Sequence, residues 1–158
     1  MKPILALAPL AAAVIAAGCG SGSAPTSASS GAQTRSGSAM VATAHTRLGT
    51  VLVDARGRTL YLFAKDRGSS SSCYGSCASV WPPLLTDVDP APGAGAHAAR
   101  LGSSRRRDGK RIVTYSGHPL YTYAGDSKPG DVHGQGADQF GAPWYVLAPS
   151  GAKIDDDQ

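Results

Sequence analysis

The cysteines are the residues of this 158-residue chain best suited to covalent chemistry. Cys73 and Cys77 stand four positions apart in "CYGSC". One helical turn or a tight loop would bring their Cα atoms within the roughly 4.4–6.8 Å of a disulfide. A redox-active pair is the alternative, but the spacing is not Cys-x-x-Cys and no strand–helix unit surrounds it. We therefore predict a structural disulfide that fixes the Ser/Gly-rich loop 67–76 and contributes only about 2 kcal/mol, because the closed loop is short.

A loop rich in Asp, Gln and Gly, residues 129–139, holds the other candidate for site chemistry. Its His133 and Asp131, with Asp126 just before them, offer nitrogen and oxygen ligands for a metal ion. The spacing matches no EF-hand, and a copper or zinc site that also used the thiols would need both cysteines reduced. Lone histidines and acidic loops are usually solvated, so we expect neither a metal nor a cofactor.

The usual motifs of enzyme active sites are missing from the sequence. There is no Gly-x-Ser-x-Gly, no phosphate-binding loop and no dinucleotide fingerprint. All eleven acidic residues are Asp, so a catalytic carboxylate pair would have to consist of two aspartates. Asp66 and Asp126 are the pair that symmetry could bring together, but repeat-related strand caps are far commoner than catalytic dyads. We expect a protein that is not an enzyme.

Two stretches of sixteen residues align with each other without a gap. The stretch "VLVDARGRTLYLFAKD" (51–66) matches "RIVTYSGHPLYTYAGD" (111–126). The two copies share a Tyr-x-aromatic-Ala-x-Asp signature, and each is followed by a tryptophan. We consider the repeated residues, with these tryptophans, as a candidate binding face: Tyr61, Phe63, Asp66, Trp81, Tyr121, Tyr123, Asp126 and Trp144.

Alternating and β-branched residues predict that each copy is a hairpin. Strands are expected at 50–55, 58–64, 110–115, 119–124 and 144–149, and Asp108-Gly109 predicts a further hairpin in which 99–106 pairs with 110–115. Leu60 and Leu62 then lie on one face, and Tyr61 and Phe63 on the other. We expect the aromatic face to form the core or a shared groove.

The expected fold class is therefore all-β. The domain is a small, loop-rich unit of two tandem hairpin or meander repeats, and it closes with pseudo-twofold symmetry because one hairpin cannot bury its own aromatic face. We expect Asp66 and Asp126 to end their strands by bonding their own following backbone N–H groups as Asx turns.

The composition supports this fold class. The absence of Glu and the twenty Gly residues favour turns and strands over helices. The formal net charge of +4 is too small to indicate a nucleic-acid partner. The cluster Arg105-Arg106-Arg107 is more often the solvated flank of a turn than a binding patch.

The chain resembles the bacterial exported lipoproteins with a Tyr-x-[Phe/Trp/Tyr]-x-x-Asp motif, also called a secreted repeat of unknown function. The first copy matches at Gly57-Arg58-Thr59-Leu60-Tyr61, Phe63, Asp66, Cys73, Cys77 and Trp81-Pro82-Pro83-Leu84. The second matches at Asp108-Gly109, Gly117, Pro119-Leu120-Tyr121, Tyr123, Asp126, Pro129-Gly130-Asp131, Gly134-Gln135-Gly136 and Trp144-Tyr145; His133 departs from the small polar residue that is common there. The resemblance implies an export address and an architecture, but no reaction.

The N-terminus fits this resemblance. Residues 1–18 resemble a lipoprotein signal peptide, with an apolar run from Ile4 to Ala17 that is too short to span a bilayer. Small residues before Cys19 form a lipobox-like pattern, which predicts a lipidated (palmitate-bearing) cysteine. Ordinary signal cleavage near Ala17 is the alternative.

The rest of the chain divides by composition. Residues 19–44 are expected to be the lipidated cysteine and a flexible Ser/Gly/Ala linker, 45–150 the duplicated domain, and 151–158 a disordered acidic tail. Within the domain, copy one covers about 45–100 and copy two about 101–150.

Two functions follow from these observations. The first is a non-enzymatic lipoprotein of the cell envelope, anchored to the membrane at its extracytoplasmic face, which binds a small ligand or an envelope protein. The alternative is an extracytoplasmic redox or metal-handling protein that uses Cys73 and Cys77 with His133.

Overall fold

Nearly every regular element of the domain is a β-strand. The structure, a computed structural model, describes residues 37–155. The strands are β1 (Met40–Thr46), β2 (Gly49–Asp54), β3 (Tyr61–Phe63), β4 (Ala91–Pro92), β5 (Leu101–Arg105), β6 (Arg111–Tyr115), β7 (His118–Pro119), β8 (Asp138–Gln139) and β9 (Ala142–Val146). One short α-helix, α1 (Ser76–Val80), and a 3-10 helix at Ala98–Arg100 complete them. This confirms the predicted all-β fold class.

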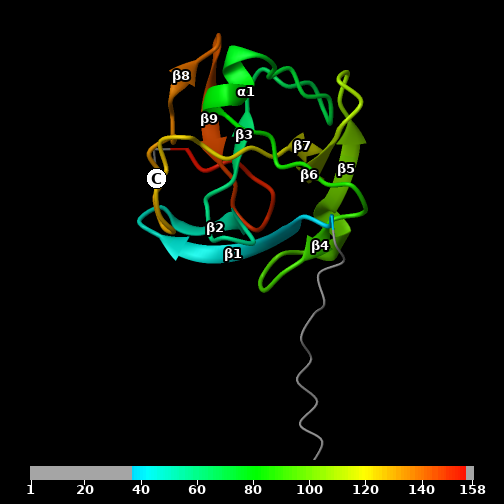
Figure 1. The fold of residues 1–158 in the computed structure, drawn as a ribbon. Coiled ribbons are helices and arrows are strands. Elements are labelled where there is room, and N and C mark those ends of the chain that lie inside the picture. Colours follow the sequence, from blue (N-terminus) through cyan, green and yellow to red (C-terminus); the bar gives the residue numbers. More distant parts are fainter. Residues whose placement is uncertain (1–36, 156–158) are drawn as a thin grey trace, which may run out of the picture. The chain divides into compact units, whose positions relative to one another are not determined.

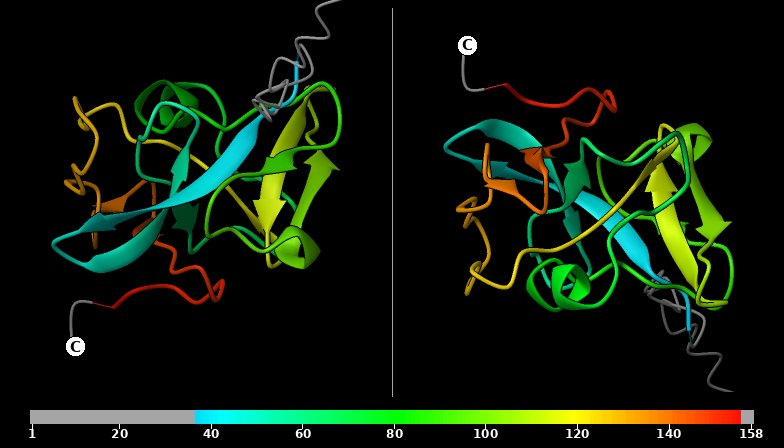
Figure 2. Two further views of the ribbon diagram at one scale, coloured as in Figure 1. Left: turned by 90° about the horizontal axis from the view of Figure 1, so that it is seen from below. Right: turned by 90° about the horizontal axis from the view of Figure 1, so that it is seen from above.

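The strands form three small sheets, ordered β2-β1-β4, β3-β9-β8 and β5-β6-β7. The first sheet lies along the base of the domain in Figure 1. The views of Figure 2 place β5 and β6 on the opposite side of the domain from β8 and β9.

The predicted hairpins are present, although their second strands are shorter than expected. β5 and β6 pair antiparallel around Asp108-Gly109, where Gly109 has a φ of 84°. β6 and β7 are joined by Ser116-Gly117, which has positive φ at both residues (49° and 83°), the pattern of a type I′ turn. In copy one the chain returns after Gly57 and makes a bridge between Val53 and Thr59.

The two copies meet at equivalent residues. The backbone N–H of Tyr61 donates to the carbonyl of Tyr121 at 2.8 Å, and the N–H of Tyr121 donates to the carbonyl of Tyr61 at 3.0 Å. This reciprocal antiparallel bridge is what a local twofold axis between β3 and the chain after β7 would produce. The expected pairing of the copies is therefore present in the backbone.

The alternating side chains of β3 and of Leu60, which precedes it, enter two different cores, as the period of two predicts. Tyr61 and Phe63 join an aromatic core with Trp81 and Trp144. Leu60 and Leu62 join an aliphatic core that also holds Val41, Leu52, Val113, Tyr115, Leu120 and Leu147. The strands at the centre of the domain are therefore buried on both faces.

The expected start of the domain is wrong. The sequence places residues 40–44 in a flexible linker because they continue a run of Ala, Thr and Ser, but in the structure they belong to β1. Val41 is fully buried, and Ala42 and Ala44 pack against the aromatic core. A strand of small residues has little hydrophobic signal of its own and is fixed by pairing with β2.

The expected end of the domain is also wrong for residues 151–155. Gly151 is buried, and the N–H of Ile154 donates to the carbonyl of Val146 at 2.8 Å. The segment therefore packs beside β9 rather than forming part of a free tail. Residues 156–158 lie outside the described residues, as do the predicted signal peptide, Cys19 and linker residues 20–36. Within residues 37–155, no helix has the length and apolar character needed to cross a bilayer.

Candidate functional site

Four aromatic rings from the two copies form one continuous stack at the centre of the domain. The order is Phe63, Trp144, Trp81, Tyr123, with successive centroids 4.0, 4.0 and 4.4 Å apart and interplanar angles of 5°, 3° and 30°. Copy one supplies the first and third rings, and copy two the second and fourth. Each repeat-related pair is thus placed symmetrically about the contact between the tryptophans.

Two further tyrosines close the sides of this stack. Tyr61 meets Trp81 edge-on at 5.3 Å and 79°, and Tyr121 meets Trp144 edge-on at 5.1 Å and 88°. Edge-to-face pairs of this kind add about 0.5–1.5 kcal/mol each beyond their burial. The structure places the predicted aromatic face in the core, since all of these rings are buried except the half-buried Tyr123.

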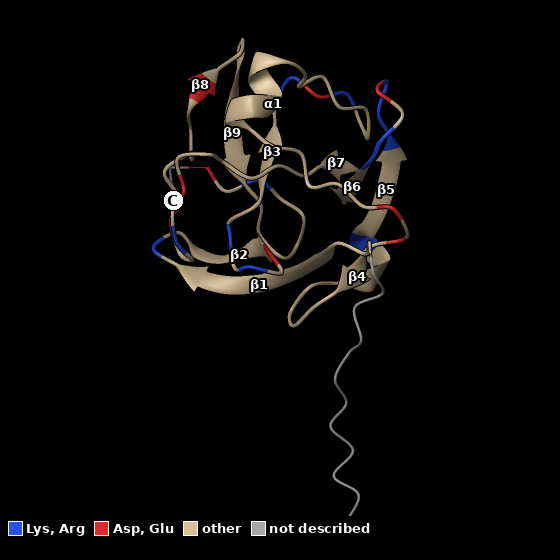
Figure 3. Ribbon diagram, viewed as in Figure 1, with Lys and Arg blue, Asp and Glu red and all other residues tan. Residues whose placement is uncertain are grey.

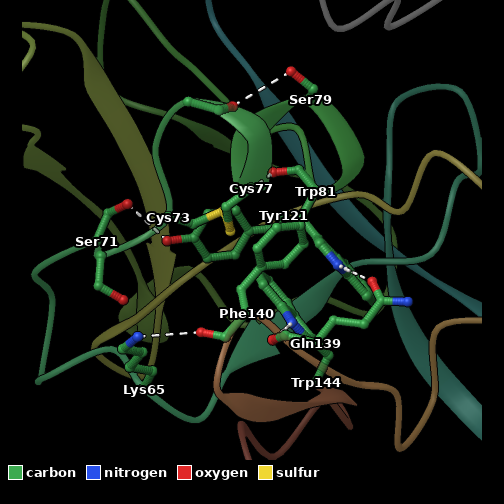
Figure 4. The surroundings of a disulfide bond; sticks show 12 residues. Lys65, Ser71, Cys73, Cys77, Ser79, Trp81, Tyr121, Gln139, Phe140 and Trp144 are labelled. Carbon is green, nitrogen blue, oxygen red and sulfur yellow. Dashed lines mark hydrogen bonds between the residues drawn. A yellow bond between two sulfur atoms is a disulfide. The ribbon is translucent and has the colours of Figure 1, made fainter.

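Gln139 satisfies both buried indoles. Its side-chain oxygen accepts from Nε1 of Trp81 at 2.9 Å, and its backbone oxygen accepts from Nε1 of Trp144 at 3.1 Å (Figure 4). Sequence reasoning missed this residue because Gln139 is outside the repeated segments. The two-residue turn that follows, Phe140-Gly141, has positive φ at both positions (60° and 88°). Sequence patterns do not predict this hairpin, because Asn or Asp, and not Phe, is typical of the first turn position.

The Tyr and Asp of the repeated signature bond across the copies rather than within them. The hydroxyl of Tyr61 donates to Oδ2 of Asp126 at 2.7 Å. In the same way, the hydroxyl of Tyr121 donates to Oδ2 of Asp66 at 2.7 Å. We call these two bonds the reciprocal Tyr–Asp pair.

The second oxygen of each carboxylate also has an equivalent partner. Oδ1 of Asp126 accepts the backbone N–H of His133 at 3.0 Å, and Oδ1 of Asp66 accepts the backbone N–H of Ser72 at 2.7 Å. These partners lie seven and six residues along the chain. The predicted Asx turns are therefore wrong, because each carboxylate binds the tyrosine hydroxyl of the other copy and a backbone N–H six or seven residues along the chain.

Burial raises the pKa of the hydroxyl groups of both Tyr61 and Tyr121. The pKa of Tyr61 is raised far above its usual range because water is removed from the phenolate, and the hydrogen bond to Asp126 raises it further. The pKa of Tyr121 is raised in the same way, by burial and then by the charge of Asp66. Both hydroxyls therefore stay protonated, as hydrogen-bond donors, above the pH at which an exposed tyrosine ionises.

The candidate metal ligands form a closed loop instead of a cation site. Asp131 accepts from the side-chain Nζ of Lys128 at 2.8 Å and from the backbone N–H groups of Ser127 and Lys128. These bonds hold the pKa of Asp131 well below its usual range, with Lys128 as the largest cause. Nδ1 of His133 lies 3.3 Å from Asp126, whose Oδ2 is already bonded to Tyr61. Between residues 37 and 155, no three His, Cys, Asp or Glu side chains are grouped as metal ligands.

Cys73 and Cys77 form the predicted disulfide, with their Cα atoms 5.3 Å apart (Figure 4). Both residues are buried in the aromatic core, and Cys77 lies in α1. The bridge closes the chain just before Trp81, whose N–H donates to the carbonyl of Cys77 at 2.7 Å. It therefore helps to position one tryptophan of the stack.

Comparison with known families identifies the repeat. The model of a lipoprotein family described as a secreted repeat of unknown function matches the chain twice, at residues 42–85 and 102–148. The chain belongs to this family. Each match to the secreted-repeat family contains one Tyr–Asp signature and one tryptophan of the stack. Comparisons with curated proteins and with solved structures gave no match.

Proposed function

We propose that this secreted-repeat protein is a lipid-anchored lipoprotein on the extracytoplasmic face of the membrane, and that its domain acts by binding rather than by catalysis. The binding role, as opposed to catalysis, is supported by the hydrogen bonds that the motif residues make. The tyrosine and aspartate of each copy bond to the other copy, and the tryptophan N–H groups bond to Gln139. Side chains that could do chemistry are thus engaged in holding the two copies together.

The anchoring half rests on the N-terminal sequence and on the family. The domain belongs to a lipoprotein family, and Cys19 follows an apolar run that ends in small residues. A single acyl chain binds membranes only marginally, so stable anchoring would require more than one chain on this cysteine. The membrane is then one partner, and a ligand or envelope protein bound at the domain surface is the other.

The redox alternative is not favoured. Cys73 and Cys77 are joined to each other and buried in the aromatic core, so a reductant or a metal would have to reach sulfurs that packing covers. His133, the residue proposed to act with them, instead accompanies Asp126 at the reciprocal Tyr–Asp pair. These positions give the cysteines a structural role.

The anchoring is tested by Cys19→Ser in the full-length protein expressed in a bacterium that processes lipoproteins. Wild type should incorporate labelled palmitate and sediment with membranes, whereas the variant should incorporate none and appear in the soluble fraction. Cys73→Ser with Cys77→Ser is the matched control, because it removes cysteines but should leave labelling intact. A Cys19→Ser protein that stays with the membrane fraction would overturn the proposal.

A further inference from the structure

The three consecutive arginines in the turn between β5 and β6 differ sharply in their surroundings. Arg106 has a side chain only 2% exposed, whereas Arg105 and Arg107 are exposed. The guanidinium of Arg106 donates to Oγ of Ser71 at 2.5 Å, to the carbonyl of Cys73 at 3.0 Å and to Asp108 at 3.2 Å. The expectation that the whole cluster is a solvated turn flank is therefore wrong for its central residue.

Tyr74 organises the outer part of this cluster. The Cζ atoms of Arg106 and Arg107 lie 4.2 and 3.8 Å from the centroid of its ring. The Tyr74 hydroxyl accepts the backbone N–H of Arg107 at 3.1 Å. Because Tyr74 lies inside the loop closed by the disulfide, the bridge restrains the ring on which the guanidinium groups rest.

The reciprocal Tyr–Asp pair supports the inner arginine. The hydroxyls of Ser71 and Tyr121 are 2.7 Å apart. Since the Tyr121 proton is directed to Asp66, the Ser71 hydroxyl donates to Tyr121 and keeps its lone pairs for Arg106. A continuous chain of hydrogen bonds thus runs from the half-buried carboxylate of Asp66 through Tyr121 and Ser71 to the buried guanidinium of Arg106.

These residues enclose a hollow with excess positive charge. Ser70, Ser71 and Tyr74 line it from copy one, and Arg105, Arg106 and Arg107 from the start of copy two, with a volume of about 360 Å³. Asp108 pairs with Arg106, but no carboxylate of residues 37–155 forms an ion pair with Arg105 or Arg107. Guanidinium groups restrained by an aromatic ring keep a fork of N–H donors, which suits a multi-oxygen anion.

We propose that this hollow binds a phosphate group carried by a soluble ligand. The guanidinium groups of Arg105 and Arg107 have no carboxylate partner in the described part of the chain, although one N–H of Arg105 donates to the carbonyl of Gly109 at 3.0 Å. Their remaining N–H groups and the Ser70 hydroxyl supply charged and neutral donors for a tetrahedral anion, and the buried Arg106 adds positive potential beneath them. This proposal specifies the class of ligand for the binding function proposed above, and it rests on that function. Figure 3 shows this turn at the top of the domain and the first described residues at the bottom beside β4. The test below separates a soluble ligand from a lipid headgroup.

The test is calorimetric titration of inorganic phosphate into the purified Cys19→Ser protein. We expect saturable binding at one site, and Arg107→Gln should weaken it about tenfold (about 1.4 kcal/mol), because the variant loses a charge-assisted hydrogen bond to the anion. Arg56→Gln is the matched control, since it removes an exposed arginine from the turn after β2 and should change the affinity less than about twofold. The variant with both Cys73→Ser and Cys77→Ser should also bind phosphate more weakly, because Tyr74 is released.

Three results would overturn this site. One is the absence of saturable phosphate binding by the folded protein. Another is equal weakening of phosphate binding by Arg56→Gln and Arg107→Gln, which would indicate nonspecific electrostatic attraction instead of a site. The third is Arg107-dependent binding to phosphatidylglycerol vesicles without binding of inorganic phosphate, which would assign the patch to a lipid surface. Because the Cys19→Ser protein is used, these results are independent of whether the anchoring is correct.

Discussion

At the scale of single residues, the repeated signature has a physical explanation that lies between the copies. Each tyrosine needs a partner for its buried hydroxyl, and the aspartate of the other copy supplies it. The tyrosine and the aspartate therefore recur together in the signature, although the hydrogen bond of each tyrosine goes to the aspartate of the other copy. The sequence predicts that the aromatic residues recur for packing, but it does not reveal which carboxylate each hydroxyl meets.

Loss of Asp126 should cost more than loss of Asp66. Asp126→Ala leaves the Tyr61 hydroxyl and the His133 N–H without their partner, so the free energy of unfolding should fall by about 1–3 kcal/mol. The loss for Asp66→Ala should lie at the lower end of this range, because Asp66 is only half-buried and water can replace its carboxylate. Urea unfolding measures the free energy of unfolding of both variants. Asp138→Ala, an exposed change in β8, is the control and should stay within about 0.5 kcal/mol; equal losses at all three sites would contradict the pairing.

The raised pKa values of Tyr61 and Tyr121 predict a loss of stability in alkali. Unfolded tyrosine ionises near pH 10 while the folded groups stay protonated, so this stabilisation is complete below about pH 10 and falls as pH rises above it. The free energy of unfolding should then drop by about 1.4 kcal/mol per pH unit for each tyrosine. Denaturant titrations between pH 9 and 11.5 measure the slope. Tyr61→Phe should halve it, and an unchanged slope would show that the hydroxyl titrates freely in the folded state.

At the scale of elements, the period of two was sufficient to predict which residues of the segment 60–63 share a face. Leu60 and Leu62 enter one core and Tyr61 and Phe63 the other, as the alternation indicates. The turns at Asp108-Gly109 and Ser116-Gly117 were also predictable, because Gly supplies the positive φ that they use. β1 was missed because its small residues gain their stability from the partner strand, and Gln139 because its role depends on two distant indoles.

The aromatic stack should be the most sensitive element to truncation. Phe63→Ala removes a buried ring that is stacked on Trp144, so it should lower the free energy of unfolding by about 3–5 kcal/mol. Tyr123→Ala removes the equivalent ring at the other end, but this ring is half-buried and the loss should be smaller. Guanidinium unfolding followed by tryptophan fluorescence compares them. A larger loss for Tyr123→Ala would contradict the observed difference in burial.

At the scale of the whole molecule, the duplication builds one scaffold from two incomplete halves. The stack alternates rings from the two copies, and the backbone bridge joins Tyr61 to Tyr121. Neither half can satisfy its tyrosine or cover its tryptophan without the other. The loop of copy one and the hairpin turn of copy two then meet at the surface, where the basic hollow is formed.

The central claim is that the two copies fold as a single cooperative unit, and differential scanning calorimetry of the purified Cys19→Ser protein tests it most directly. The account predicts one transition whose calorimetric and van't Hoff enthalpies agree, and Phe63→Ala should lower the midpoint of that whole transition. Since the mutation is in copy one while its stacking partner Trp144 is in copy two, both halves must respond together. Two separable transitions, with Phe63→Ala shifting only one of them, would contradict the account.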